Sequence, residues 1–114
     1  MVVERGEIWW ADLDDPRGSE PGFPRPVLIV QRDSFNRSRI NTVIAVALTT
    51  NMNLVGSPGN VLIHSKDSGL ARDSVANVSQ VITVDKTYLA RRLARLREPL
   101  LAEVEEGLRM IMDL

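Results

Sequence analysis

Cysteine is absent from this 114-residue sequence, and histidine occurs once, at position 64. Without cysteine there is no disulfide framework, no thiol nucleophile and no thiolate-bound metal. A single imidazole cannot supply a pair of histidines for acid–base catalysis, and we expect His64, at the end of a strand, to be an ordinary surface residue. These absences exclude several common enzyme classes before any motif is considered.

Long hydrophobic runs are also absent. The longest, 27–30 and 43–48, have the length of strands and fall far short of the roughly 20 residues that cross a bilayer. The N-terminus has no basic segment followed by an apolar one, so we expect no signal peptide, a cytoplasmic location and no membrane contact. With 44% hydrophobic and 25% charged residues, the composition predicts a single globular domain over 1–114.

The net charge is close to zero, at −1, but the charged residues are unevenly distributed along the chain. Between Arg17 and Arg39 the chain has five arginines and two acidic residues, a local charge of +3. Arginine suits planar, bidentate contact with phosphate. The pattern is compatible with modest affinity for nucleic acid.

Motifs for cofactors and metals are missing as well. The sequence has no glycine-rich loop of the Walker or dinucleotide type and no cluster with zinc-ligand spacing. Asp12, Asp14 and Asp15 could in principle hold Mg²⁺, although carboxylates beside a turn are more often solvated. We expect no cofactor and no metal.

What is present reads mainly as β-structure followed by a helix. Apolar runs and turn residues predict strands at 6–13, 27–30, 42–49, 61–64 and 75–84. We expect Trp9 and Trp10, in the first of these, to pack in the core or at an interface rather than stack on a base. Segment 31–41 is either an exposed loop or a single helical turn.

The C-terminal third contains one ambiguous segment. In 85–97, Asp85 could cap a helix, or a turn could lead to a strand at 91–96. Beyond it, Pro99 suits the first position of a helix. The apolar residues that follow have helical spacing: Leu100, Leu101, Val104, Leu108 and Ile111. The predicted architecture is a strongly bent, mostly antiparallel sheet or small barrel, closed by this terminal helix.

Two segments carry polar side chains suited to a site. The loop 18–26 contains three prolines and two glycines, and it brings Ser19, Glu20 and Arg25 to the start of the strand at 27–30. These side chains either form a phosphate-binding site or belong to a structural loop with a solvated arginine. In 75–84, the apolar period is lost near Ser79 and Gln80, which predicts a bulge.

Several motifs, taken in order, resemble the MazF/PemK/Kid toxins of bacterial toxin–antitoxin systems. The similarity covers nearly the whole chain. Each motif alone is weak, but all of them in this order are specific to the family. The motifs are Arg5-Gly6-Glu7-Ile8-Trp9, Gly18-Ser19-Glu20, Arg25-Pro26-Val27-Leu28, Leu48-Thr49, Arg72-Asp73-Ser74-Val75 and Gln80-Val81-Ile82-Thr83-Val84-Asp85-Lys86.

The resemblance implies a mainly β fold with a C-terminal α-helix, an SH3-like barrel of the CcdB/PemK-like plasmid maintenance toxin type. It favours a turn after Asp85, a strand near 91–96 and the helix from Pro99. It further implies a homodimer, a cognate antitoxin, and contact with operator DNA only through the toxin–antitoxin complex.

The activity implied is that of a metal-independent endoribonuclease that cuts single-stranded RNA at short sequences. Attack by the ribose 2′-OH would leave a 2′,3′-cyclic phosphate and a 5′-OH. The family's catalytic arginine and threonine fall on Arg25 and Thr49. Glu20 is a candidate base, or it orients Arg25, because arginine is very hard to deprotonate.

RNA-binding groups are expected around a groove, since single-stranded RNA is read through splayed bases. The candidates are Ser19, Arg32, Asn36, Asn77, Ser79 and Gln80. Two other functions remain open at this point: a gyrase-poisoning toxin of the same fold, and a catalytically silent nucleic-acid-binding autorepressor.

Overall fold

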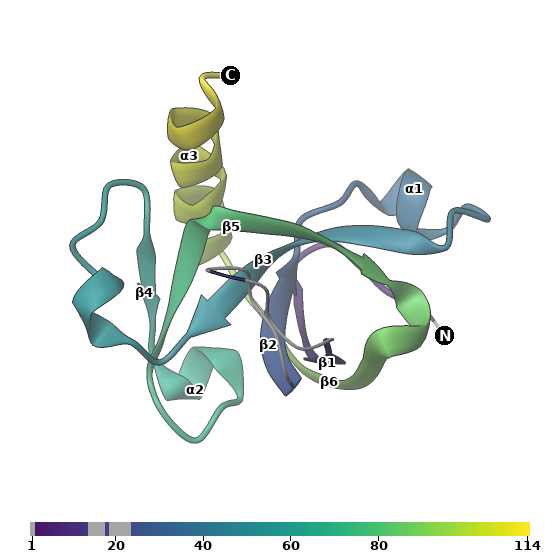
Figure 1. Ribbon diagram of the computed structural model, residues 1–114, viewed down its shortest axis with the longest axis horizontal. Helices are drawn as coiled ribbons and strands as arrows, with labels where there is room; N and C mark the ends of the chain where they lie inside the picture. Colours follow the sequence, from purple (N-terminus) through teal and green to yellow (C-terminus); the bar gives the residue numbers. More distant parts are fainter. Residues whose placement is uncertain (1, 14–17, 19–23) are drawn as a thin grey trace.

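The computed structural model of the protein describes residues 2–13, 18 and 24–114. Six strands make up most of the regular secondary structure in the described residues, and the one long helix follows the last of them (Figure 1). The strands are β1 (Glu7–Asp12), β2 (Pro24–Ile29), β3 (Thr42–Thr49), β4 (Val61–Ile63), β5 (Ser74–Asp85) and β6 (Leu89–Arg95). The helical segments are α1 (Asp33–Asn36), η1 (Met52–Leu54), α2 (Ser65–Ser68), η2 (Lys86–Tyr88) and α3 (Leu100–Met112).

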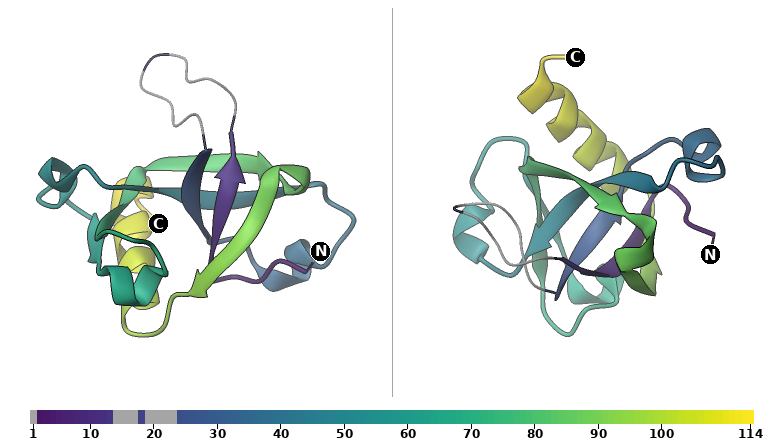
Figure 2. Two further views of the ribbon diagram at one scale, coloured as in Figure 1. Left: turned by 90° about the horizontal axis from the view of Figure 1, so that it is seen from below. Right: turned by 45° about the vertical axis from the view of Figure 1, so that its right-hand side comes forward.

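The strands form one antiparallel sheet in the order β4-β5-β3-β2-β1-β6. The sheet curls into a half-barrel, and the helix α3 stands beside β4 and β5 (Figures 1 and 2). This confirms the predicted mainly β fold with a C-terminal helix. No helix in the described part of the chain is both long and apolar enough to cross a membrane.

The central strand β3 is buried on both faces of the sheet. Residues on one face join a core under α3, which includes Leu28, Leu48 and Val104. Residues on the other face join a second core, which includes Val27 and Ala45. Double burial explains why β3 is the clearest strand in the sequence, and its observed bounds are those predicted.

The predicted bulge in β5 is confirmed by the strand register. Val46 pairs with Val81, but Leu48 pairs with Ala76, so residues 77–80 of β5 stand opposite Ala47. The strand bends sharply there (Figures 1 and 2). The side chain of Asn60 accepts a hydrogen bond from the Val78 N–H at 3.0 Å, replacing the ladder partner that the bulge removes.

The ambiguous segment 85–97 is resolved in favour of a turn and a strand. Asp85 does cap, accepting hydrogen bonds from the backbone N–H and the hydroxyl of Thr87, but it caps only the single turn η2. β6 then pairs with β1 along its length. Segment 31–41 contains the single helical turn α1, which was one of the two alternatives.

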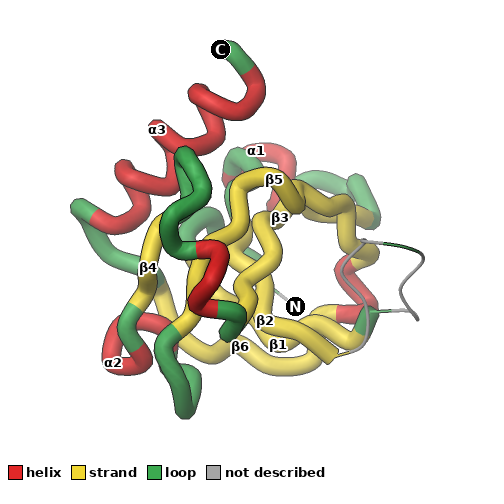
Figure 3. The backbone as a smooth tube through the Cα atoms, turned by 60° about the vertical axis from the view of Figure 1, so that its left-hand side comes forward, coloured by secondary structure: helices red, strands yellow, loops and turns green. Residues whose placement is uncertain are grey.

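The helix α3 approaches the loop before β4 through two glycines. A Cβ added to Gly107 would lie 2.0 Å from the carbonyl oxygen of Gly59, so only glycine fits there. Val104, Gly107 and Leu108 are buried, whereas Ile111, predicted on the apolar face, is 50% exposed. The prediction for Ile111 is wrong because the last turn projects past the sheet (Figure 3).

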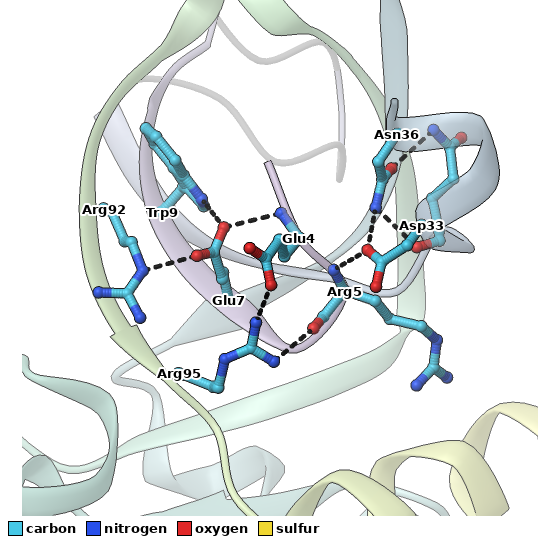
Figure 4. Close-up of polar contacts among 9 residues, drawn as sticks. Glu4, Arg5, Glu7, Trp9, Asp33, Asn36, Arg92 and Arg95 are labelled. Atoms are coloured by element: carbon cyan, nitrogen blue, oxygen red, sulfur yellow. Dashed lines mark hydrogen bonds and ion pairs between the residues drawn. The ribbon is translucent and has the colours of Figure 1, made fainter. Parts of the chain in front are cut away.

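The N-terminal segment is tied to the sheet by a buried carboxylate (Figure 4). Glu7 accepts hydrogen bonds from the Glu4 N–H (2.8 Å), the Trp9 indole (3.0 Å) and Arg92 Nε (2.7 Å). Burial alone would raise the pKa of Glu7, but these three donors together lower it below its usual range.

We expect Gly107→Ala to lower the free energy of unfolding by about 2 kcal/mol or more, because the new methyl group must push α3 away from Gly59. Urea denaturation followed by circular dichroism measures the change. Glu103→Ala, at an exposed position of the same helix, should change stability by less than about 0.5 kcal/mol. A Gly107→Ala protein as stable as the wild type would contradict the packing described here.

Glu7 should make folding stability depend on pH. Because its pKa is lower in the folded than in the unfolded state, it stabilises the fold above the unfolded value of 4.5. That contribution is lost as the pH falls through the folded pKa. In urea titrations from pH 7 to pH 3, Glu7→Gln should lower stability at pH 7 and flatten its fall with acid.

The exposed Glu103→Gln variant is the control for the loss of one carboxylate, and it should keep the wild-type dependence on pH. The role given to Glu7 would be wrong if Glu7→Gln lost stability in acid as steeply as the wild type.

Candidate active site

One end of the sheet collects the first residues of β2 and β5 and the last residues of β3. Arg25 of β2 pairs with Ala11 of β1, and Val27 pairs with Ala47 of β3. Continuing the second register by two residues brings Arg25 opposite Thr49. Thr49 in turn pairs with Val75 of β5. Antiparallel neighbours share a face of the sheet, so Arg25 and Thr49 lie on the same side.

A pocket of about 420 Å³ lies at this end, and both Arg25 and Thr49 line it. Its volume is within the range of small-molecule sites, about 300–1,000 Å³. The remaining lining residues come from β1, β2, the end of β3 with the residue after it, and the start of β5 with the segment before it: Trp10, Pro24, Pro26, Leu48, Thr50, Leu70, Ala71, Arg72 and Ser74. The structure therefore brings together the two residues that were expected to be catalytic.

The Thr49 hydroxyl is oriented by the chain that follows it. The backbone N–H of Asn51 donates a hydrogen bond to Thr49 Oγ1 at 3.1 Å. With its oxygen used as an acceptor, the hydroxyl can direct its own hydrogen to a ligand. Half-buried Arg25 and Thr49 can thus both act as donors to an anionic group.

Another part of the pocket wall is the segment 70–74, which is anchored through Asp73. The Asp73 carboxylate accepts hydrogen bonds from the Ser65 N–H (2.9 Å) and contacts the His64 ring (3.3 Å). The Ser65 N–H and then His64 lower the pKa of Asp73. The residues on either side of Asp73, Arg72 and Ser74, line the pocket.

Ser74 has a feature not shared by the other buried polar side chains in the described part of the molecule. It is fully buried, and its hydroxyl has no hydrogen-bond partner. An unsatisfied buried hydroxyl is costly, and such groups in native structures call for an explanation such as a functional role. Here the orphaned hydroxyl belongs to a residue of the Arg25 pocket wall.

Of the other predicted site residues, Ser19 and Glu20 lie outside the described residues. Asn77, Ser79 and Gln80 occupy the β5 bulge, opposite Ala47 and next to the strand end that carries Thr49. Asn77 is buried, and its carbonyl oxygen accepts hydrogen bonds from Ser79 Oγ (2.8 Å) and Asn60 Nδ2 (3.4 Å).

Arg32 and Asn36 are at the other end of the sheet. The buried Asn36 amide is bonded to Gln31 and Asp33, and Gln31 also bonds the Thr42 carbonyl at the start of β3. Thr42 is seven residues from Thr49, or about 23 Å along the strand. Within one chain, Arg32 and Asn36 are therefore not brought together with Arg25.

Several pocket residues were missed by sequence reasoning, among them Trp10, Arg72 and Ser74. Arg72 and Ser74 belong to a motif that supported the family resemblance, but nothing in their spacing indicated a site. Trp10 was expected to pack in the same way as Trp9. The two are distinguished only by the pairing of the first strand, which places Trp9 opposite Val27 and Trp10 opposite Pro26. Across the described residues no group of three histidine or acidic side chains could hold a metal ion; Asp14 and Asp15 lie outside those residues.

Comparison with known proteins agrees with the fold. The chain belongs to the family of PemK-like, MazF-like toxins of type II toxin–antitoxin systems, whose model matches residues 4–112. This confirms the resemblance found in the sequence motifs.

Two relatives are similar to the protein over its whole length. Endoribonuclease MazF6 of Mycobacterium tuberculosis is 46% identical over 114 residues, covering 100% of both chains. Endoribonuclease EndoA of Bacillus subtilis is 36% identical, covering 100% of this chain and 97% of its own. Among solved structures, a mycobacterial endoribonuclease in complex with its cognate antitoxin shares the fold, with a TM-score of 0.80 at 24% identity over 98% of this chain and 96% of that one.

The orphaned hydroxyl leads to a test of stability. Ser74→Ala removes a buried group that forms no hydrogen bond, so we expect the free energy of unfolding to be unchanged or raised by up to about 1 kcal/mol. Ser68→Ala is the matched control: Ser68 is equally buried, but its Oγ accepts from the Leu70 N–H at 3.0 Å.

The Ser68 variant should lose about 1 kcal/mol or more, because it leaves that N–H without its partner. Urea denaturation of the two variants measures the difference. If Ser74→Ala were as destabilising as Ser68→Ala, the Ser74 hydroxyl would have a partner that this account lacks.

Proposed function

We propose that this protein, as an endoribonuclease toxin, cleaves single-stranded RNA at short sequences without a metal ion, and that Arg25 and Thr49 act on the scissile phosphate. The observation that carries the proposal is the shared pocket of these two side chains. Sequence similarity to endoribonucleases over the full chain supports the reaction class.

The reaction would be a transesterification within the RNA chain, at the scissile phosphate. The ribose 2′-oxygen forms a bond to phosphorus while the bond from phosphorus to the 5′-oxygen breaks. The 2′-OH proton passes to a base, and the leaving 5′-oxygen takes up a proton. The products are a 2′,3′-cyclic phosphate and a 5′-OH.

Arg25 and Thr49 would stabilise the negative charge that develops on the oxygens of the phosphate in this step. The guanidinium can donate two parallel hydrogen bonds to the non-bridging oxygens. The Thr49 hydroxyl, its oxygen engaged by the Asn51 N–H, can donate to a non-bridging oxygen or to the 2′-oxygen. Donors held in place before the reaction lower the barrier because they need no reorganisation.

The proton acceptor is a separate question. Arginine stays protonated at any ordinary pH, so Arg25 is a poor base. Glu20 is the chemically easier candidate, either as the base or as the group that orients Arg25. It lies outside the described residues, and its role here rests on the family resemblance.

Recognition of the RNA sequence is proposed for polar groups near the pocket. Ser79 and Gln80 lie on the β5 bulge, beside the strand end that carries Thr49, and Ser19 belongs to the loop before Arg25. Asn77 lies on the same bulge, where its carbonyl oxygen accepts from Ser79. Arg32 and Asn36 could contribute only at a second position along the RNA, about 23 Å away.

Membership of a toxin–antitoxin family supports an antitoxin partner. We propose that its acidic segment occupies the same groove as the RNA, attracted by the arginine-rich segment 17–39. We further propose a homodimer, contact with operator DNA only through the toxin–antitoxin complex, and a cytoplasmic location.

Arg25→Ala should lower the rate of RNA cleavage by about 100-fold or more, because it removes the charged donor at the scissile phosphate. The measurement uses purified protein and a long single-stranded RNA in EDTA, with cut sites and ends mapped. The wild type should give discrete cuts with 5′-OH ends.

Arg109→Ala is the control for charge. It removes one arginine from the outer surface of α3, and it should cleave at the wild-type rate. Cleavage by Arg25→Ala at the wild-type rate would refute the mechanism. RNA left intact by the wild-type protein would refute the proposed function itself, and a gyrase supercoiling assay would then test the alternative toxin class.

A further inference from the structure

We propose that Trp10 is a stacking platform for the nucleobase next to the scissile phosphate, so that the Arg25 pocket holds a base as well as a phosphate. The inference rests on the proposed function, and it assigns a role in substrate recognition to a residue that the fold does not need in its core.

The two neighbouring tryptophans have different surroundings. Trp9 is 8% exposed, packs in the second core and donates its indole N–H to Glu7. Trp10 points to the other face of the strand, is only half-buried and lines the pocket. Among the described residues, none accepts a hydrogen bond from its indole. Trp10 therefore offers both an accessible ring and an unused donor.

The walls of the pocket near Trp10 suit a flat aromatic ligand. They are formed by apolar side chains, namely Pro24, Pro26, Leu48, Leu70 and Ala71, with the cation Arg72 at the exposed edge. A base can stack on the indole and lie against apolar walls, while its backbone remains near the guanidinium groups.

The backbone holds Trp10 firmly in position. It pairs with Pro26 on one side and Arg91 on the other. The β1–β6 register shifts both before Trp9 and after Trp10, and irregularities of this kind re-aim side chains near functional sites. A ring presented by a paired strand loses little freedom when a base stacks on it.

The position relative to Arg25 fits one nucleotide. Trp10 is opposite Pro26, the neighbour of Arg25. From a strand separation of about 4.8 Å and a rise of about 3.3 Å per residue, the Trp10 and Arg25 backbones are about 6 Å apart. Trp10 shares a face of the sheet with Pro26, so its side chain and that of Arg25 leave opposite faces, and the two meet only at the end of the sheet, where both line the pocket. A phosphate held there by Arg25 leaves the adjoining base within reach of the indole.

The test uses a short RNA that spans a cut site mapped with the wild-type protein, together with versions in which each base flanking the cut is removed in turn. Stacking of a base on an aromatic side chain is worth roughly 5- to 150-fold, so one abasic RNA should show a loss of kcat/KM in this range with the wild type.

Trp10→Leu should lower kcat/KM on the intact RNA by a similar factor, and the same abasic change should then cost less than about twofold. Trp10→Phe keeps a ring and should retain most of the wild-type sensitivity. Tyr88→Leu, which removes an exposed aromatic side chain outside the pocket, should match the wild type on every RNA.

A second measurement does not depend on catalysis. An RNA with a 2′-deoxy sugar at the cut cannot react, and its binding should quench the fluorescence of the wild type, whereas Trp10→Phe, which keeps only the buried Trp9, should show no quenching. Thermal unfolding checks that each variant is folded.

The inference would be overturned if removing the flanking base lowered the kcat/KM of Trp10→Leu as much as that of the wild type. Quenching that persists in Trp10→Phe would overturn it too, and either result would leave the nuclease function standing. No cleavage of any RNA by the wild type would instead overturn the proposed function, and this inference with it.

Discussion

The register of β3 against its two neighbours is the constraint on which the rest of the structure depends. Both faces of this strand are buried, so a slip of one residue would move its side chains into the wrong core. The register with β2 brings Arg25 level with Thr49, and the register with β5 adds the segment that begins at Ser74. The pocket is a consequence of packing in the centre of the sheet.

Polar groups elsewhere in the described molecule are satisfied with few exceptions. Glu7 has three donors, Asn36 is bonded on both sides of its amide, and Asn60 supplies the acceptor that the β5 bulge needs. Around the pocket this pattern changes: the Ser74 hydroxyl is orphaned, and the Trp10 indole donates a hydrogen bond to none of the described residues. Polar groups that lack a partner within the protein are expected where a protein binds its ligand.

Much of the fold could be predicted from residue patterns. The alternation in 42–49 and the loss of period near Ser79 gave β3 and the bulge because both patterns are local. Segment 85–97 remained ambiguous, since Leu89, Leu93 and Leu96 fit a helix and only pairing with β1 makes part of it a strand. Ile111 was assigned to the buried face because spacing alone does not tell where a helix runs past its sheet.

The sequence by itself predicted most of the elements and their order and, through the family resemblance, the strand in 85–97 and the pairing of Arg25 with Thr49. Only the tertiary structure decided which other side chains join them. Trp10, Arg72 and Ser74 reach the pocket, while Arg32 and Asn36 lie at the far end of β3. The reason is physical: neighbours across a sheet are fixed by pairing between residues distant in the chain, which no local pattern encodes.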